Sequence, residues 1–486
     1  MLFSSVSFLF GFLPLCLLLY FLVPKRLKNA VIFFLSLIFY AWGEPVYAFL
    51  MLGALSSAYA FGFLIRKYRE RNRRVARLFL WTSVLINLSL LVFFKYTNFF
   101  IENLRSISPL FSTLTPISGL ALPVGISFYT FQIISYSIDL YLGKTELQRN
   151  YINFGTYVSL FPQLIAGPIV KYSDVDRQLA DRTVTVEKFA HGIKRFVTGL
   201  SKKLILGDGA GALHAYFSSS FQFAPTSLAS WMMMITYTLH IYFDFSGYSD
   251  MAIGLGQMLG FDFPENFNYP YIATSITDFW RRWHITLSSF FREYVYIPLG
   301  GNRCAPARQY MNLAVVWLLT GLWHGAAWTF VLWGAWYLAL LIIEKAFFKQ
   351  KSAHFQSIPA RFFGHAYTLF CVGIGWLIFS SDSVRLALSS IGGLFFIGTG
   401  ALSYPELSYT AIGSLPFLIF CAICSTPALK NLIRKVSRKL FSRPSRAFRV
   451  PTAVYALEAV GFALLFVIDI SYAASGSYSP FLYFNF

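Results

Sequence analysis

Long apolar runs, separated by short polar connections, follow one another along almost the whole chain. A helix needs about 20 apolar residues to cross the hydrocarbon core of a membrane, and several runs reach that length. The runs cover about 5–23, 30–42, 46–65, 78–95, 118–142, 152–170, 186–206, 227–245, 248–260, 311–322, 325–347, 363–380, 384–400, 409–428 and 451–472. We therefore predict an all-α polytopic integral membrane protein with about 11 transmembrane helices.

Proline and glycine interrupt the runs in the middle of the chain, at Pro123, Gly125, Pro162, Gly167, Pro168, Gly254, Gly256 and Pro264. Helices broken at membrane depth are stable only where protein or a water-filled cavity surrounds them. We therefore expect re-entrant and interfacial helices around a central funnel or tunnel. Residues 1–486 are predicted to form a single transmembrane domain, with the site motifs in a core at about 118–347 and C-terminal helices at about 363–486.

The composition supports a membrane protein, and this affects how the net positive charge of the chain is interpreted. Hydrophobic residues make up 56% of the chain and charged residues 13%, whereas a soluble domain is about 25% charged. The net charge is +19, which in a soluble protein would suggest nucleic acid binding. Here the basic residues gather in short connections between apolar runs. That distribution indicates loops that face anionic membrane lipid, and no nucleic acid partner.

Three basic segments predict the orientation in the membrane. Residues 25–28 follow the first span, residues 66–77 follow the third, and residues 430–449 precede the last and contain no acid. Basic loops stay on the cytoplasmic side, which leaves both chain termini on the extracytoplasmic side of a multi-pass protein of the cell (inner, cytoplasmic) membrane. The opening residues lack a basic n-region and a cleavage site, so the first span is expected to be retained.

Two histidines lie inside apolar stretches, each among aromatic residues: His284 in 278–286 and His324 in 321–328. An ionisable side chain at membrane depth is costly and usually functional. Histidine can take and give a proton near neutral pH. We interpret both as proton-handling groups. The alternative is a pair of core histidines whose hydrogen bonds are satisfied by neighbours.

His324 is the stronger candidate for a general base. Gly321 and Gly325 flank it, and small residues let another part of the chain or a substrate come close. Burial disfavours the imidazolium form, so a buried imidazole stays neutral and able to accept a proton. Such a base suits the activation of a hydroxyl group against a thioester. We predict that His284 assists at the same site.

Two aspartates lie close together in the segment Tyr242–Asp250. Asp244 and Asp250 are six residues apart, a spacing that does not put them on one helix face, and Ser246 and Gly247 between them predict a helix break. Asp250 then either caps the following helix or contributes to a site. Both alternatives stay open at this point.

The residues just before His284 are Trp280, Arg281, Arg282 and Trp283. Their pattern is typical of an interfacial amphipathic helix, with Asp278 as a helix cap. The arginines could hold the phosphates of a nucleotide-linked acyl donor or contact anionic lipid. These four residues, Trp323 and the two aspartates are our substrate-binding candidates. The sequence contains no glycine-rich phosphate loop, zinc-ligand spacing or serine nucleophile elbow, so we predict no metal and no tightly bound cofactor.

Several stretches resemble the membrane-bound O-acyltransferase family, and most of all its bacterial branch typified by the alginate O-acetylation membrane protein. They are Tyr242–Asp250, Pro264–Pro270, Phe279–Ile285, Tyr296–Arg303, Leu319–Gly325, the opening Phe3–Ser5 and the closing Phe481–Phe486. The resemblance implies a helical ring around a funnel. It also implies that His324 is the catalytic histidine and His284 the second characteristic histidine of the family.

The resemblance implies an acyltransferase that moves an acetyl group from a cytoplasmic donor, acetyl-coenzyme A or an acylated carrier, to an acceptor across the membrane. The implied partner is an extracytoplasmic, SGNH or hydrolase-like acetyltransferase that completes O-acetylation of a polysaccharide. The closing motif has Leu482 and Asn485 where the branch has Ile and Gln. The polymer therefore stays open among alginate, another exopolysaccharide and peptidoglycan.

Tyr483 is the third catalytic candidate. The positive-inside pattern places it on the extracytoplasmic side, where its hydroxyl could accept the acyl group from the His324 site and present it to an external transferase. The resemblance implies the same role, because this branch carries a tyrosine in a matching terminal motif. The alternative is an aromatic residue that anchors the last span at the membrane interface.

Two other functions compete with acetyl transfer. A related acyltransferase moves D-alanine to teichoic acid, but the stretch Tyr296–Arg303 favours the alginate-like branch. A transporter or flippase with broken helices would show inverted repeats of hydropathy, and the sequence contains none.

Overall fold

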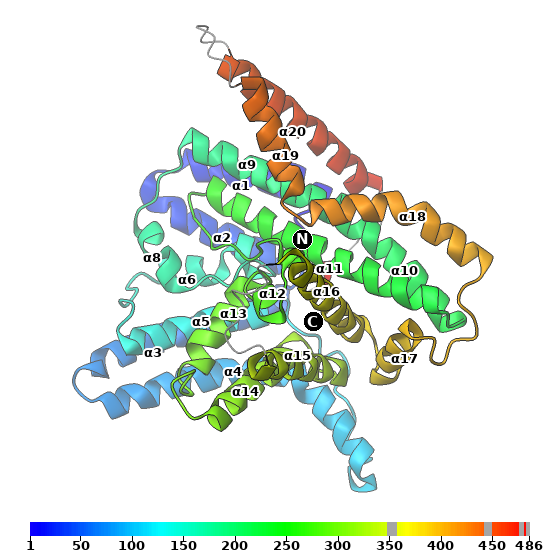
Figure 1. Ribbon diagram of the computed structural model, residues 1–486. Helices are drawn as coiled ribbons and strands as arrows, with labels where there is room; N and C mark the ends of the chain where they lie inside the picture. Colours follow the sequence, from blue (N-terminus) through cyan, green and yellow to red (C-terminus); the bar gives the residue numbers. More distant parts are fainter. Residues whose placement is uncertain (348–356, 442–449, 476–480, 483–486) are drawn as a thin grey trace.

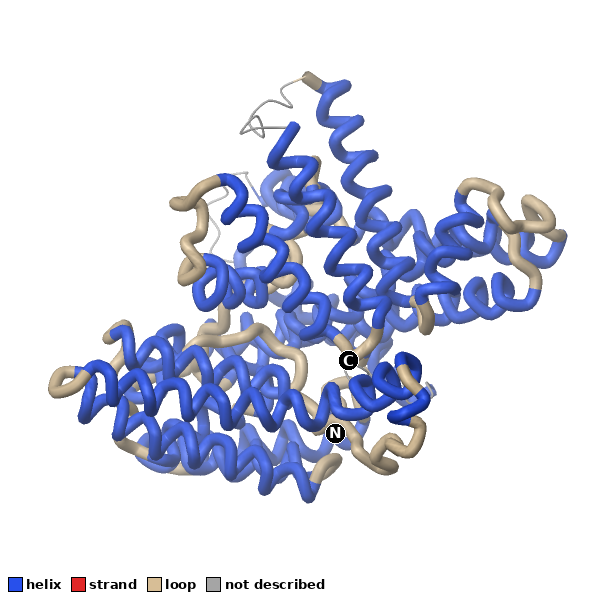
Figure 2. Tube along the Cα trace, turned by 90° about the horizontal axis from the view of Figure 1, so that it is seen from below, coloured by secondary structure: helices blue, strands red, loops and turns tan. Residues whose placement is uncertain are grey.

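The computed structural model describes residues 1–347, 357–441, 450–475 and 481–482. In this part of the chain the regular structure is helical, apart from one isolated bridge between Thr226 and Ala401 (Figure 2). The predicted all-α class is therefore confirmed.

The helices follow the apolar runs of the sequence, with the boundaries set by caps, prolines and glycines. They are α1 Leu13–Leu22, α2 Lys28–Ala41, α3 Pro45–Arg69, α4 Arg73–Ile107, α5 Ile126–Leu142, α6 Tyr151–Ser159, α7 Phe161–Leu164, α8 Tyr172–Ala180, α9 Val186–Ser201, α10 Asp208–Phe223, α11 Ser227–Met258, α12 Ile276–Trp280, α13 Ile285–Phe291, α14 Pro306–His324, α15 Trp328–Phe347, α16 Ile358–Ser380, α17 Val384–Leu394, α18 Pro405–Cys424, α19 Ala428–Phe441 and α20 Val450–Ser475. Two π-helical turns matter below, η4 Lys202–Gly207 and η6 Arg292–Tyr296.

Among the described residues, six helices are long and apolar enough to cross a membrane: α3, α4, α15, α16, α18 and the part of α20 from residue 456 to 475. The residues from Phe8 to Leu22 and helix α17 are shorter apolar helices. The polytopic membrane class is confirmed, although fewer helices meet these criteria than the number we expected. The run at 152–170 shows why, because it forms the short helices α6 and α7 instead of one span.

The predicted helix break between Asp244 and Asp250 is wrong, because α11 continues through both residues. Gly247 serves close packing instead. A Cβ atom there would lie 2.7 Å from the carbonyl oxygen of Gly199 in α9. Glycines in membrane helices commonly allow such close backbone approach. Asp250 lies inside the helix and therefore does not cap one.

Gly254 and Gly256, which we expected to interrupt a helix, also lie inside α11. A Cβ atom at Gly254 would come within 2.6 Å of the carbonyl oxygen of Gly192 in α9. At Gly125 the expected interruption is confirmed. Gly125 has φ 77°, a left-handed conformation that favours glycine, and α5 begins at the next residue.

Helix α11 occupies the middle of the molecule, and α9, α10, η4, α16 and α17 pack against it (Figure 1). Helix α5 is similarly buried along almost its whole length, and α3 and α4 pack on it. Helices α14 and α15 pack against each other and α15 reaches α16. The two histidines of interest lie between these groups of helices.

Candidate active site

His284 lies at the start of α13, in a conformation that the surrounding chain imposes. Its backbone angles, φ 42° and ψ 54°, are left-handed, which is unfavourable for a residue with a Cβ atom. The neighbouring Ile285 N–H donates to the carbonyl oxygen of Asn266 at 3.0 Å. The polar loop before α12 therefore fixes the backbone that presents His284.

Asn266 also fixes the imidazole of His284. It is fully buried, and its Oδ1 accepts hydrogen bonds from His284 Nδ1 at 3.1 Å and from Thr286 Oγ1 at 2.9 Å. Because an amide oxygen only accepts, Nδ1 carries the proton and Nε2 is the basic nitrogen of the neutral ring. Asn266 lies in the stretch Pro264–Pro270 quoted above, but it was not among the site residues predicted from the sequence. The feature of the sequence that could have indicated Asn266 is that it is a polar side chain inside one of the quoted motifs.

His324 is the last residue of α14 and is surrounded by aromatic side chains of neighbouring helices. Only 3% of it is exposed. Its ring meets Trp333 of α15 and Phe379 of α16 at centroid distances of 4.9 and 5.2 Å, both in edge-to-face geometry. Such a cage excludes water and strengthens any electrostatic interaction inside it.

The indole of Trp323 brings the two histidines together. Its centroid lies 5.9 Å from the ring of His284 and 5.0 Å from the ring of His324. The two imidazoles therefore lie against one indole, although they come from separate helices. This is the arrangement that two residues of one site require.

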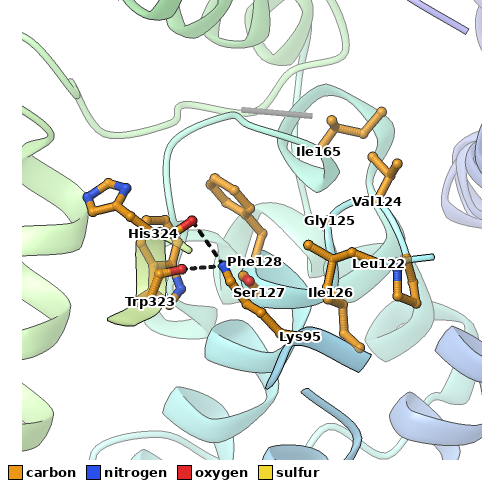
Figure 3. A pocket seen from close by; sticks show the side chains of 11 residues that line it. Lys95, Leu122, Val124, Gly125, Ile126, Ser127, Phe128, Ile165, Trp323 and His324 are labelled. Atoms are coloured by element: carbon orange, nitrogen blue, oxygen red, sulfur yellow. Dashed lines mark hydrogen bonds between the residues drawn. The ribbon is translucent and has the colours of Figure 1, made fainter. Parts of the chain in front are cut away.

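Helix α4 closes the end of α14 that carries His324. Lys95 Nζ donates to the carbonyl oxygens of Trp323 and His324, the latter at 3.2 Å (Figure 3). The Tyr96 hydroxyl donates to the carbonyl oxygen of Leu322. The last carbonyls of a helix lack internal partners and a cation there is favourable. Lys95 thus holds the backbone of His324, while the imidazole points away from it (Figure 3).

Lys95 was not predicted from the sequence, although a lone lysine inside the apolar sequence of α4 indicates a functional residue. The flanking glycines of His324 behave as expected for a close approach. A Cβ atom at Gly321 would lie 2.4 Å from the carbonyl oxygen of Phe330, and one at Gly325 would lie 2.1 Å from the Phe330 ring. The segment that approaches His324 is therefore the beginning of α15.

Two pockets adjoin the elements that carry the histidines, and His324 lines one of them. A narrow one, shown in Figure 3, is lined by Lys95, Leu122, Pro123, Val124, Gly125, Ile126, Ser127, Phe128, Ile165, Trp323 and His324. A larger one of about 1020 Å³ is lined by Trp280, Arg281, Ile285, Ser288, Ser289, Arg292, Tyr296, Ile297, Gly300, Gly301, Asn302 and Arg303. We call the larger one the arginine pocket.

The arginine pocket is strongly basic. Arg281, Arg292 and Arg303 line it, and no acidic residue does. Within the described ranges, none of the three forms an ion pair with a carboxylate. Gly300 and Gly301 have φ 111° and 54°, so the turn that forms one wall needs glycine. A pocket with unpaired guanidinium groups is suited to a phosphate or another polyanion.

The four predicted residues before His284 divide between two environments. Trp280 and Arg281 line the arginine pocket, and the Trp280 ring packs 5.6 Å from Trp333, which also contacts His324. Arg282 instead pairs with Asp278 at 3.0 Å, and Trp283 is buried among aromatic rings.

The predicted helix cap at Asp278 is wrong. The Ser275 side chain accepts the N–H of Asp278 and caps α12, while Asp278 lies in its first turn. The carboxylate of Asp278 therefore accepts a hydrogen bond from Arg282 Nε instead of from free helix N–H groups.

The two aspartates of α11 meet cations of the chain itself. Asp250 pairs with Arg195 and Lys202 at 2.6 and 2.7 Å. Asp244, which is fully buried, lies 3.3 Å from Lys203. Neither lines the two pockets described above. Tyr483, the remaining candidate, lies outside the described residues.

Comparison with known proteins places this geometry in a family. The sequence profile of MBOAT, the membrane-bound O-acyltransferase family, matches residues 148–391, a range that includes both histidines. A probable alginate O-acetylase, AlgI, of Pseudomonas putida is 40% identical over 503 residues that cover 100% of both chains. The chain belongs to the membrane-bound O-acyltransferase family. It is an acyltransferase and a multi-pass membrane protein.

Two further relatives refine the comparison. A peptidoglycan O-acetyltransferase of Helicobacter pylori is 33% identical over 527 residues, which cover 100% of this chain and 98% of the relative. A teichoic acid D-alanyltransferase of Bacillus subtilis is 29% identical over 252 residues, 49% of this chain and 62% of the relative. The O-acetyltransferases therefore resemble this membrane-bound O-acyltransferase over a much longer range. In the described part of the chain, no cluster of three or more His, Cys, Asp or Glu suits a metal ion.

Proposed function

We propose that this membrane-bound O-acyltransferase moves an acetyl group from a cytoplasmic donor across the cell membrane for O-acetylation of an extracytoplasmic polysaccharide. The acceptor polymer is an alginate-like exopolysaccharide or peptidoglycan, the two kinds named in its full-length relatives. The observation that carries the proposal is the placement of His284 and His324 against one indole, Trp323, inside an aromatic enclosure.

His324 acts as the general base. It removes the proton of an acceptor hydroxyl, the oxygen attacks the thioester carbonyl, and the carbon–sulfur bond breaks as the thiol takes a proton and leaves. His284 assists by positioning the acyl group, with its ring fixed by Asn266. Neutral imidazoles suit this chemistry, and their burial favours the neutral form.

The arginine pocket receives the phosphate-bearing part of the donor, acetyl-coenzyme A or an acylated carrier. Its position along α5 supports this assignment. The Tyr294 hydroxyl, in η6 beside the pocket, donates to Asp139 Oδ2 at 2.7 Å near the end of α5. Arg69 of the basic segment 66–77 donates to the carbonyl oxygen of Leu140 at 2.9 Å. The pocket therefore lies at the end of α5 that contacts the segment assigned to the cytoplasm.

The His324 site lies toward the opposite end of α5. Residues 122–128, at the start of that helix, line the narrow pocket together with His324. The α5 helix of 17 residues is about 25 Å long. A donor that enters from the basic end thus meets His324 on the way to the extracytoplasmic side. Met1 lies beside Gly43, at the end of α3 remote from Arg69, which supports an extracytoplasmic position for the opening residues.

Arginine substitutions test the donor site. Arg281→Gln combined with Arg292→Gln should raise the KM for a phosphate-bearing acetyl donor by about tenfold or more, with a smaller change in kcat, because charge-assisted hydrogen bonds to phosphate are lost. Initial rates with the purified protein in liposomes give both constants. Arg308→Gln removes an exposed arginine of α14 outside the pocket and is the matched control. An unchanged KM in the double variant would place the donor elsewhere.

A cell-based experiment tests the function as a whole. The chain is expressed in a bacterium that lacks its own polysaccharide O-acetylation membrane protein but retains the external transferase. Mass spectrometry of the exported polymers should then detect acetyl esters that depend on the chain and disappear with His324→Ala. D-alanyl esters on teichoic acid, without acetyl esters, would support the competing function instead. An extracytoplasmic hydrolase-like transferase is the partner that this proposal requires.

A further inference from the structure

A short segment near the end of the sequence is held inside the protein. Phe481 is only 1% exposed. Its ring stacks on Tyr248 of α11, with centroids 4.7 Å apart, and lies 5.8 Å from the ring of Phe245. Phe3 belongs to the same aromatic group, because its ring also stacks on Tyr248, with centroids 4.8 Å apart. Phe481 therefore fills an aromatic slot on α11.

The backbone of the same segment is held by a buried charge. The Leu482 N–H donates to Asp244 Oδ2 at 3.0 Å. Asp244 is fully buried, and its other oxygen lies 3.3 Å from Lys203 Nζ, which also pairs with Asp208. A buried carboxylate is costly unless cations and hydrogen-bond donors satisfy it. Here one of those donors is the N–H of Leu482, in a charge-assisted hydrogen bond.

The aromatic slot adjoins the histidine pair. Phe245, which contacts Phe481, also lies 4.8 Å from the ring of His284 in edge-to-face geometry. One phenyl ring thus separates Phe481 from His284. Leu482 is the residue that immediately precedes Tyr483 in the sequence.

We propose that Asp244, with Phe245 and Tyr248, forms a docking site for the segment Phe481–Leu482, and that Asp244 is a positioning residue for Tyr483. The inference rests on the proposed function, since it takes Tyr483 as the acceptor of the acyl group. The docking site recognises the aromatic ring of Phe481 and the backbone N–H of the next residue, Leu482. The side chain of Leu482 only packs against the core, whereas its N–H makes the hydrogen bond to the buried carboxylate.

A pair of substitutions at one position tests this requirement. Leu482→Pro removes the N–H, and Leu482→Ala keeps it. In the full-length protein in liposomes, with acetyl-coenzyme A and the external transferase, Leu482→Pro should deliver acetyl to the polymer about tenfold or more slowly than Leu482→Ala, because a hydrogen bond to a charged group is lost. The KM for the donor should be equal in both. Equal delivery rates in the two variants would overturn the docking role of the N–H.

Hydrogen exchange tests the same contact without any acyl transfer. In the wild-type protein the Leu482 amide should exchange slowly, and Asp244→Asn should speed its exchange by about tenfold or more. Asp250→Asn removes another buried charge of α11 that does not touch the segment, so exchange at Leu482 should not change. Fast exchange in the wild-type protein would refute the docking site. Slow exchange in a protein that transfers no acetyl would instead refute the proposed function alone.

Discussion

Replacement of His324 by alanine should lower kcat for acetyl transfer by roughly 10²–10⁴-fold, the range that general-base catalysis typically supplies. The imidazole lies at the end of α14 inside a cage made by Trp323, Trp333 and Phe379, so no other described side chain of the cage can take a proton in its place. The rate is measured with the purified protein in liposomes, from labelled acetyl donor to a soluble acceptor or to the external transferase.

The backbone contacts at His324 do not involve its side chain, so we expect the fold to be preserved in His324→Ala. Lys95 binds the carbonyl oxygens at the end of α14, not the imidazole, so these hydrogen bonds remain in His324→Ala. The variant should therefore insert into the membrane and elute as the wild-type protein does. His191→Ala, at an exposed histidine of α9, is the matched control and should keep the wild-type rate. A loss of only severalfold in His324→Ala would show that this imidazole is not the base.

Much of the fold could be predicted, because apolar runs at membrane depth must be helical. The runs at 46–65 and 363–380 correspond to α3 and α16. The prediction failed at Gly247, where the same residue type permits a break in one context and close helix packing in another. Only the position of Gly199 on the facing helix decides between them, and that contact comes from a distant part of the sequence.

Residues of the candidate site could be selected from the sequence where a residue type is rare in its setting. A histidine in an apolar stretch is conspicuous, and both His284 and His324 could be selected on that basis. Asn266 and Lys95 were missed, because their roles are hydrogen bonds to residues far away in the sequence. The same limit applies to Arg292, whose pocket is formed only when α12, α13 and the following turn come together.

Arg281 and Arg282 illustrate how far a prediction from sequence can distinguish two neighbouring residues. Both were predicted as substrate-binding residues, because they are adjacent cations in one aromatic motif. After the short helix α12, the chain turns so that Arg281 faces the arginine pocket and Arg282 reaches back to Asp278. A cation with a carboxylate partner four residues earlier on the same turn is satisfied locally. That spacing was visible in the sequence and favours Arg281 as the residue free to bind a ligand.

Tyr483→Phe should stop acetyl delivery to the external acceptor while donor binding is unchanged. The substitution keeps the ring and removes only the hydroxyl oxygen, so an anchoring role at the membrane interface would survive it. As an acyl carrier, the hydroxyl loses its proton to His324, attacks the donor thioester carbonyl and becomes an ester as the thiol leaves. Its sequence neighbours Phe481 and Leu482 are docked beside Phe245, whose ring contacts that of His284.

The measurement has two parts. Acetyl esters on the polymer are quantified after incubation with the external transferase, and mass spectrometry of the peptide that contains Tyr483 detects the acetylated intermediate. We expect the wild-type peptide to gain one acetyl group when the external transferase is omitted, and the Tyr483→Phe peptide to gain none. Tyr472→Phe, at an exposed tyrosine of α20, removes a hydroxyl from the same region and should deliver acetyl normally. Normal delivery by Tyr483→Phe would leave this tyrosine as an anchor, with the acyl group passing directly from the His324 site to its acceptor.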